Sequence, residues 1–385
     1  MHLSQILPSI FSSLGLTTAQ DLIQCGESPS GRELVFLVDG LGADVLSAYA
    51  SVAPSLSAMA LHGTVTTSFP STTATSLATL TTGEMPGAHG MLGYTVQVPR
   101  SGGRILNTLK WDERVDPVIW QPVPTLFERA MAAGITTTHV AAKRYENTGF
   151  TRAVFRGAHY KGANIAADLI SETVAALEKS PSFVYLYVND LDSAGHSDGV
   201  GSDKWIAALV SIDELVKNLA QKLPKGTRMW LTADHGMINA SEKIVLGRDN
   251  DLLSDVALIA GEPRMRHLYL TADSEKAGEE VIARWESALG SKVTMHTRAS
   301  AITAGLFGPE VSLDAAERAG DVIAIAQGDL VLLDPERADK EGAMIGHHGG
   351  DSVIESSVPL LVHSVNQLSS VGSSDLRPNI ISSHE

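Results

Sequence analysis

The chain has 385 residues, 44% of them hydrophobic, and a formal net charge of −15 at pH 7. This size and hydrophobic content suffice for one large core or two smaller ones. The acidic balance argues against a nucleic-acid polymer as a tightly held partner, because such binding needs a basic surface that displaces counterions. A small phosphate ester is not excluded, since carboxylates that hold divalent cations do not present their full formal charge to a substrate.

The first residues and the single cysteine bear on the location of the protein. Residues 1–18 have no cationic segment before their apolar residues, and no apolar run approaches the roughly 20 residues that cross a bilayer. Cys25 stands alone, so neither an intrachain disulfide nor a cysteine metal cage can form. We therefore expect a cytoplasmic protein without a membrane partner, and its oligomeric state stays open.

Apolar, β-branched runs alternate with helical patterns over the first 240 residues and return near the C-terminus. This alternation predicts an α/β fold with a mostly parallel sheet. The helix candidates have apolar residues at helical intervals. The predicted strands are Leu34–Val38, His139–Ala142, Val184–Val188, Met229–Thr232 and Val358–Val362, and the predicted helices are Pro124–Ala133, Ile165–Glu178 and Trp205–Leu219.

The pattern changes between about residues 241 and 340. Strand-like runs at His267–Thr271, Val322–Ala326 and Leu330–Leu333 accompany a helix-like run at Glu275–Leu289. We expect residues 241–340 to form an inserted α+β subdomain, with residues 1–240 and 341–385 forming the catalytic core. The Ser-rich stretch after Val365 is typical of a loosely held terminus.

Polar side chains directly follow three of the predicted strands. Asp39 follows the first, Asp192 comes shortly after the third, and Asp234 and His235 follow the fourth. Ligands of open α/β sheets collect beyond the carboxyl ends of the strands. Each aspartate alone is as easily a turn or helix cap. Together with the pair His347 and His348 they offer the oxygen and nitrogen donors that Zn²⁺ or a similar divalent ion takes.

A hydroxyl-rich segment, Ser68–Ser76, leads into an Ala- and Leu-rich run. Pro70 ends any preceding regular element, and hydroxyl residues can supply the N-cap of a following helix. A hydroxyl at that helix start would lie where backbone N–H groups and the helix dipole favour phosphate. The alternative is a capped turn without chemistry. Coordination to a divalent cation can make a threonine hydroxyl nucleophilic, while a second cation orients phosphate oxygens.

Five motifs follow one another in fixed order along the chain. They are Phe36–Gly42, Phe69–Thr73 with Thr82–Gly90, Asp192–His196, Ala233–Met237 and His348–Gly350. This set resembles the type I phosphodiesterase/nucleotide pyrophosphatase family of the alkaline phosphatase superfamily, and the resemblance spans Leu34 to about Asp351. It implies an alkaline-phosphatase-like three-layer sandwich with a mostly parallel central sheet and a smaller inserted subdomain.

The resemblance also implies roles for single residues, with Thr73 as the nucleophile and two divalent cations, most suitably Zn²⁺, as cofactors. His348 fits the last motif better than His347, because two glycines follow it. Tyr94 stands where family members commonly carry an asparagine that holds a phosphate oxygen, and a phenol also donates one hydrogen bond. The implied ligands are Asp39, Thr73, Asp234 and His235 for one cation, and Asp192, His196 and His348 for the other.

The implied function is hydrolysis of phosphodiesters or nucleotide pyrophosphates through a covalent phosphothreonine intermediate. Its partner would be a small phosphoester such as a nucleotide. The same site also suits a phosphomonoester or a phosphonate such as phosphonoacetate. A third hypothesis is a metal-binding protein without catalysis. Tyr94 favours this hypothesis, but the hypothesis leaves the hydroxyl-rich segment unexplained.

Aromatic residues between Trp111 and Phe127 could form a substrate wall, although core packing is their commoner role. Lys143–Tyr145 could meet a leaving group, although an exposed basic turn is commoner.

Overall fold

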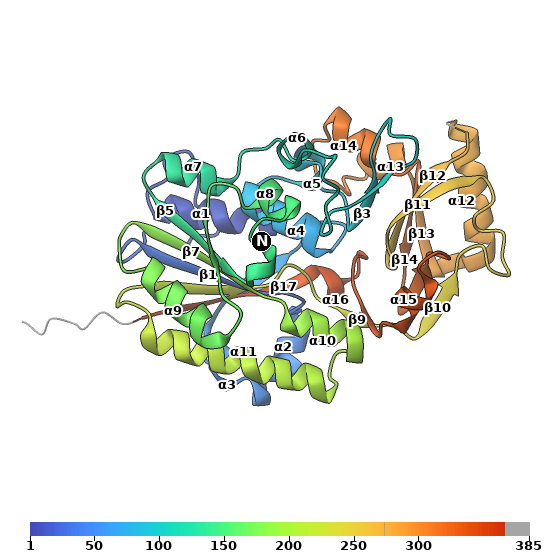
Figure 1. The fold of residues 1–385 in the computed structure, drawn as a ribbon. Helices are drawn as coiled ribbons and strands as arrows, with labels where there is room; N and C mark the ends of the chain where they lie inside the picture. The colour runs from blue at the N-terminus through green and yellow to red at the C-terminus, as the bar shows by residue number, and fades with distance from the viewer. Residues whose placement is uncertain (273, 366–385) are drawn as a thin grey trace, which may run out of the picture.

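The computed structural model describes residues 1–272 and 274–365, and it is built around a seven-stranded sheet (Figure 1). The strand order is β2–β17–β8–β1–β7–β5–β6. The pairs from β8 to β6 are parallel, whereas β17 runs antiparallel to both of its neighbours. The expected mostly parallel sheet is confirmed. The strands are β1 (Arg32–Val38), β2 (Ala60–Thr66), β5 (Thr136–Ala141), β6 (His159–Gly162), β7 (Ser182–Val188), β8 (Arg228–Thr232) and β17 (Ser357–Ser364).

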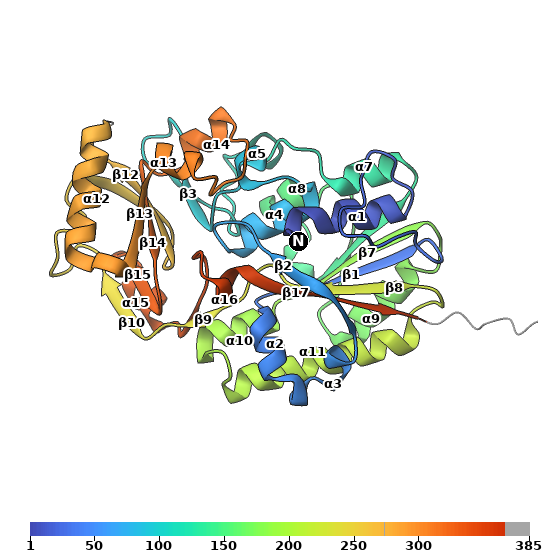
Figure 2. The same ribbon diagram turned by 180° about the vertical axis from the view of Figure 1, so that it is seen from behind.

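Helices cover both faces of this sheet, which gives three layers (Figures 1 and 2). One face carries α1 (Ile6–Ser13), α4 (Thr73–Thr82), α7 (Leu126–Ala132) and α8 (Gly149–Val154). The other face carries α2 (Ala43–Ala48), α9 (Ala166–Ala176), α10 (Asp190–Asp198) and α11 (Asp203–Lys222). Among the described residues, no helix is both long and apolar enough to cross a membrane. Short elements connect the layers: α3 (Pro54–Ser57), α5 (Pro86–His89), α6 (Pro117–Trp120), β3 (Thr95–Gln97) and β4 (Ile105–Asn107).

All five predicted strands of the main sheet are present because each is a continuous apolar run. In β1 every residue after Arg32 is buried, as expected for a strand covered on both faces. The sequence did not indicate the two edge strands. Most residues of β2 and β6 are exposed or half-buried, so neither strand has the apolar run that marks a central strand. The predicted helices match α7, α9 and α11 with small shifts at their ends.

A second, four-stranded sheet lies at one end of the molecule, in the order β11–β12–β14–β13 (Figure 1). Strand β14 is buried on both faces, since Ile323 and Ile325 join the main core while Val322, Ala324 and Ala326 join a separate core. The elements are β11 (Val256–Glu262), β12 (Met265–Leu270), α12 (Glu275–Leu289), β13 (Val293–Thr297), α13 (Arg298–Thr303), α14 (Leu313–Arg318) and β14 (Val322–Ala326).

Further short elements connect the two sheets, two of them before the second sheet and four after it. These are β9 (Ile238–Asn239), β10 (Glu242–Val245), β15 (Leu330–Leu333), α15 (Ala338–Ala343), β16 (Gly346–His347) and α16 (Val353–Ser356). The four elements predicted between residues 241 and 340 are all present, although the limits of an inserted subdomain at 241 and 340 stay a prediction. The predicted loose terminus after Val365 lies outside the described residues.

A buried ion pair ties the second sheet to the main core. Arg264, in the turn between β11 and β12, donates to both carboxylate oxygens of Glu355, and both side chains are fully buried. Glu355 also accepts from the backbone N–H of Gly350. Removing one partner of such a pair leaves an unpaired buried charge, which costs about 3–5 kcal/mol. The pair therefore fixes the second sheet against the loop that carries His348.

We expect a buried histidine to make the fold sensitive to acid. The ring of His139 lies 4.2 Å from that of Phe155, and neither ring nitrogen has a hydrogen-bond partner. Burial lowers its pKa to about 3. The unfolded chain binds this proton near pH 6.5 and the folded chain does not, so the free energy of unfolding should fall as the pH drops below about 6.5.

His139→Phe should remove this contribution. Between about pH 6 and 4, the free energy of unfolding of the variant should fall by about 1.4 kcal/mol less per pH unit than that of the wild type. Urea unfolding at several pH values measures the difference, and the exposed His159→Phe is the control. Parallel slopes for His139→Phe and wild type would show that His139 is protonated in the folded protein.

Candidate active site

Three neighbouring strands bring the predicted acidic residues to one edge of the main sheet. Strands β8, β1 and β7 are adjacent and parallel, with Val38 in register with Val188 and Leu37 with Thr232. Their carboxyl ends therefore lie side by side. Asp39 continues β1, and its N–H donates to Val188 O at 3.0 Å. Asp234 and α10, which carries Asp192, follow the neighbouring strands.

The first cluster consists of Asp39, Asp234 and His235, with Thr73 beside it. Its carboxylate and imidazole donor atoms lie within 4.8 Å of one another, and all three side chains are buried. His235 Nε2 lies 3.3 Å from Asp39 Oδ1 and 3.5 Å from Asp234 Oδ2. Thr73 Oγ1 lies 3.1 Å from the same nitrogen. The structure therefore brings together the four residues that the resemblance assigned to one cation.

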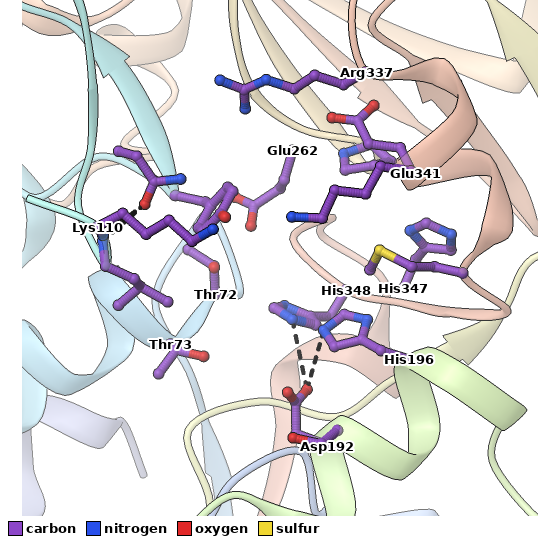
Figure 3. Close-up of a pocket in the computed structure, with 17 residues that line it drawn as sticks. Thr72, Thr73, Lys110, Asp192, His196, Glu262, Arg337, Glu341, His347 and His348 are labelled. Carbon is purple, nitrogen blue, oxygen red and sulfur yellow. Dashed lines mark hydrogen bonds and ion pairs between the residues drawn. The ribbon is translucent and has the colours of Figure 1, made fainter. Parts of the chain in front are cut away.

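The second cluster consists of Asp192, His196 and His348, again within 4.8 Å. Asp192 and His196 are four residues apart on α10, so they share one face of the helix. Figure 3 shows both histidines above Asp192, whose Oδ1 lies 3.3 Å from His196 Nε2 and 3.8 Å from His348 Nε2. The rings of His235 and His348 stack with centroids 3.6 Å apart. The two clusters are therefore neighbours.

Each cluster histidine is oriented by a backbone carbonyl. Nδ1 lies 2.8 Å from Gly346 O in His196, 3.0 Å from Gly236 O in His235 and 3.0 Å from Ser71 O in His348. A carbonyl only accepts, so Nδ1 carries the proton in each ring. The Nε2 lone pair is then free and faces the carboxylates, as in histidines that bind metals.

The buried carboxylates of both clusters lack compensation from protein groups. Asp39 Oδ1, Asp192 Oδ1 and Asp234 Oδ2 have no hydrogen-bond partner. Burial raises the pKa of all three, and the pKa of Asp39 is raised further by Asp234 and Asp192. Among the described residues, none of the three forms an ion pair with a lysine or arginine. Unpaired carboxylate oxygens next to free imidazole lone pairs fit divalent cations, with Zn²⁺ suited by the mixed oxygen and nitrogen donors.

Thr73 occupies the first position of helix α4. It is 8% exposed, and Thr72 is the N-cap residue, with extended backbone angles. The expected side-chain cap is wrong, because no hydroxyl bonds to the helix start; the Thr72 side chain instead hydrogen-bonds Glu262. The free N–H groups of the first turn therefore remain available to an anion beside Thr73.

Ser71 connects this segment to the loop of His348. Its hydroxyl donates to Gly350 O at 2.7 Å and accepts from the Gly349 N–H at 3.3 Å. A Cβ on Gly349 would lie 2.5 Å from Glu262 Cγ, at a backbone φ of +116°. Gly349 is therefore required by close packing as well as by backbone conformation.

Thr73 and the second cluster open into a cleft of about 700 Å³. Tyr94, which the sequence pointed to as a substrate contact, lines this cleft, and so does His347. Figure 3 shows Thr73 and Asp192 at one end of the cleft and Arg337 at the other, with Glu262 and Lys110 between them. The remaining lining residues are Thr72, Asn107, Leu109, Ser193, His196, Pro263, Lys340, Glu341, Met344 and His348.

Other predicted substrate contacts lie away from this cleft. Trp120 and Phe127 are buried in the main core, which supports their packing role. Tyr145 lines a smaller pocket of about 130 Å³ that also reaches Asp39 and Thr73. Lys143 and Arg144 are exposed, and Arg144 donates to Asn189 Oδ1 at 3.2 Å.

Sequence reasoning missed two residues beside the site. Tyr187, within β7, donates a hydrogen bond from its hydroxyl to Asp39 Oδ2. Glu262, at the end of β11, is 5% exposed and has one oxygen without a partner. Burial raises its pKa to about 8. The only signal for Tyr187 was weak: it is a polar-tipped residue near the carboxyl end of β7. Glu262 belongs to no motif.

Comparisons with known proteins support the resemblance to this family. The model of the family described as type I phosphodiesterase/nucleotide pyrophosphatase matches residues 34–351. Ectonucleotide pyrophosphatase/phosphodiesterase family member 1 of Rattus norvegicus is 27% identical over 243 residues, which cover 58% of this chain and 26% of the relative. The human protein is 26% identical over 236 residues, covering 56% and 25%. The chain thus spans about a quarter of these relatives.

Solved structures of similar fold cover most of the chain. Murine ectonucleotide pyrophosphatase/phosphodiesterase 5 has a TM-score of 0.67 at 17% identity, covering 86% of this chain and 88% of the other. Another structure of the murine protein is of an inactive variant in complex with AMP. Phosphonoacetate hydrolase from Sinorhizobium meliloti 1021, in complex with phosphonoformate, has a TM-score of 0.66 at 18% identity and covers 87% and 90%. These likenesses support the alkaline-phosphatase-like fold.

We expect Tyr187→Phe to weaken divalent-cation binding about 10-fold, because the phenol orients the Asp39 carboxylate and partners of this kind are worth 10–100-fold. Zinc titration against a chromophoric chelator measures the change. Tyr160→Phe is the matched control, since its hydroxyl donates to Ala142 O at 2.6 Å instead. Equal zinc affinity in wild type and Tyr187→Phe would contradict the assigned orientation role.

Proposed function

The chain belongs to the type I phosphodiesterase/nucleotide pyrophosphatase family, and we propose that it hydrolyses phosphodiesters or nucleotide pyrophosphates with Thr73 as the nucleophile. The observation that carries the proposal is the position of Thr73 Oγ1, 3.1 Å from His235 Nε2 at the start of α4. A hydroxyl, two donor clusters and free helix N–H groups meet at the end of a cleft. The substrate would be a small phosphoester, and a cytoplasmic location remains part of the proposal.

Two divalent cations, preferably Zn²⁺, would be held by the two clusters. Asp39, Asp234 and His235 would hold one together with the Thr73 oxygen. When bound, such cations lower the proton affinity of a coordinated hydroxyl and stabilise negative charge on phosphate oxygens. The second cation would be held by Asp192, His196 and His348.

The protein's own groups would carry a two-step displacement. The Thr73 hydroxyl gives up its proton as its oxygen attacks phosphorus, the bond to the leaving alcohol or phosphate breaks as that group takes up a proton, and a phosphothreonine ester forms. Water then attacks this phosphorus, the bond to the Thr73 oxygen breaks, and a proton from the water regenerates the threonine hydroxyl. The free N–H groups at the start of α4 would bind phosphate oxygens during both steps.

The cleft is large enough for a diester, since its volume of about 700 Å³ lies within the range of about 300–1,000 Å³ that small-molecule sites span. Membership of the phosphodiesterase family is the reason to propose a diester before a monoester. We expect p-nitrophenyl phenyl phosphate to be hydrolysed with a higher kcat/KM than p-nitrophenyl phosphate or phosphonoacetate. A preference for either of the latter would assign the site to phosphomonoesters or phosphonates instead.

Thr73→Ala should reduce kcat by roughly 10³-fold or more, since loss of a nucleophile removes the covalent pathway. Zinc binding should largely survive, because the other proposed ligands remain. Thr73→Ser is the matched control and should keep measurable turnover. Near wild-type turnover by Thr73→Ala would refute the nucleophile assignment. No hydrolysis of any ester by wild-type protein with stoichiometric bound zinc would indicate a binding protein without catalysis.

Prolonged treatment with EDTA should abolish hydrolysis, and Zn²⁺ should restore it better than Mg²⁺, since three of the proposed ligands are imidazoles. Metal analysis before and after chelation should show about two ions lost per chain, as expected for two closed donor sets. Equal rescue by Mg²⁺, or full activity without bound metal, would overturn the proposed cofactor.

A further inference from the structure

We propose that Lys110, Arg337 and Lys340 form a subsite for an anionic group, a carboxylate or a phosphate, which the substrate carries beyond its reacting phosphorus. This inference rests on the proposed function and deepens it. All three cations line the same cleft as Thr73. Figure 3 shows Lys110 and Arg337 entering it from opposite sides, away from Thr73 and Asp192.

These cations have little competition from protein carboxylates. Among the described residues, neither Lys110 nor Lys340 forms an ion pair. Arg337 has only a long contact, 3.9 Å from Nε to Asp334 Oδ2, and its side chain is 40% exposed. Three cations with unused charge at one cleft are unusual in a chain with a formal charge of −15. The local potential therefore favours an anion.

Besides Asp192 of the second cluster, two acids line the cleft, Glu262 and Glu341, and neither cancels this charge. Glu341 is paired with the buried Arg266 at 2.5 Å. It also accepts from the N–H of Asp334 at 3.0 Å. Burial raises the pKa of Glu262 to about 8, so its carboxyl group holds a proton at neutral pH. The far end of the cleft is therefore cationic overall.

The backbone beneath these cations is fixed by specific contacts. The N–H of Lys110 donates to Asn107 Oδ1 at 2.9 Å and to Asn107 O at 3.2 Å, which closes a turn after β4. Arg337 is the N-cap residue of α15 and Lys340 follows three residues later in its first turn, and both side chains line the cleft. The pair between Glu341 of α15 and Arg266 of β12 holds α15 against the second sheet. A flexible surface would lack these anchors.

The test compares two symmetrical diesters of nearly the same shape, bis(4-carboxyphenyl) phosphate and bis(4-carbamoylphenyl) phosphate. Only the first carries anions beyond phosphorus, and its symmetry places one of them in the cleft in either orientation. We expect the wild type to prefer the carboxylate ester. Each single change, Lys110→Gln, Arg337→Gln or Lys340→Gln, should raise its KM roughly 3-fold, and the triple variant about 20-fold, with kcat nearly unchanged.

Arg337→Lys should keep most of the preference, and Lys179→Gln is the matched control, because this exposed lysine precedes β7 at the opposite edge of the sheet. Both diesters are also titrated calorimetrically into the Thr73→Ala protein, which tests binding without turnover. Hydrolysis of both esters with equal KM in wild type and triple variant would overturn the subsite alone. Absent hydrolysis with a binding preference that the triple variant loses would overturn the proposed function and keep the subsite.

Discussion

The site depends on one electrostatic constraint, the burial of three aspartates next to one another. Asp39, Asp192 and Asp234 each have a carboxylate oxygen without a partner, and burial raises the pKa of each. Neighbouring negative charges in a medium of low dielectric are tolerated only where positive charge is supplied. The imidazoles beside them present lone pairs rather than protons. The rest of the fold therefore holds together two clusters of ligand atoms whose negative charge calls for bound cations.

The main sheet creates this proximity, and the second sheet shapes the space above it. Parallel register between β8, β1 and β7 places the aspartates at one edge, where Gly40 packs with a Cβ position only 3.1 Å from Asp192 Cβ. The Arg264–Glu355 pair then fixes β11 and β12 against the loop of His348. The loop of His348 and one wall of the cleft are thus positioned by the same buried contact between the two sheets.

The sequence predicted those parts of the molecule that depend on local pattern. Apolar runs located the central strands, and polar residues at their ends identified Asp39, Asp192, Asp234 and His235. The family resemblance added the other residues that the structure brings together, Thr73, His196 and His348. The sequence did not predict edge strands such as β2, because their residues are largely exposed. It did not identify Glu262, Lys110 and Arg337 for a different reason. Each belongs to no motif and gains its position only when segments more than 70 residues apart along the chain fold against one another.

The separation of reacting and recognising groups has an evolutionary consequence. Thr73, the two clusters and Lys110 belong to the main sheet and its connections, whereas Glu262, Arg337 and Lys340 come from the stretch that includes the second sheet. Mutations within that stretch can reshape the cleft while the bond-breaking machinery stays intact, provided that Arg264 keeps its partner. New substrate preferences could therefore arise by drift in one contiguous part of the gene, without passing through an inactive ancestor.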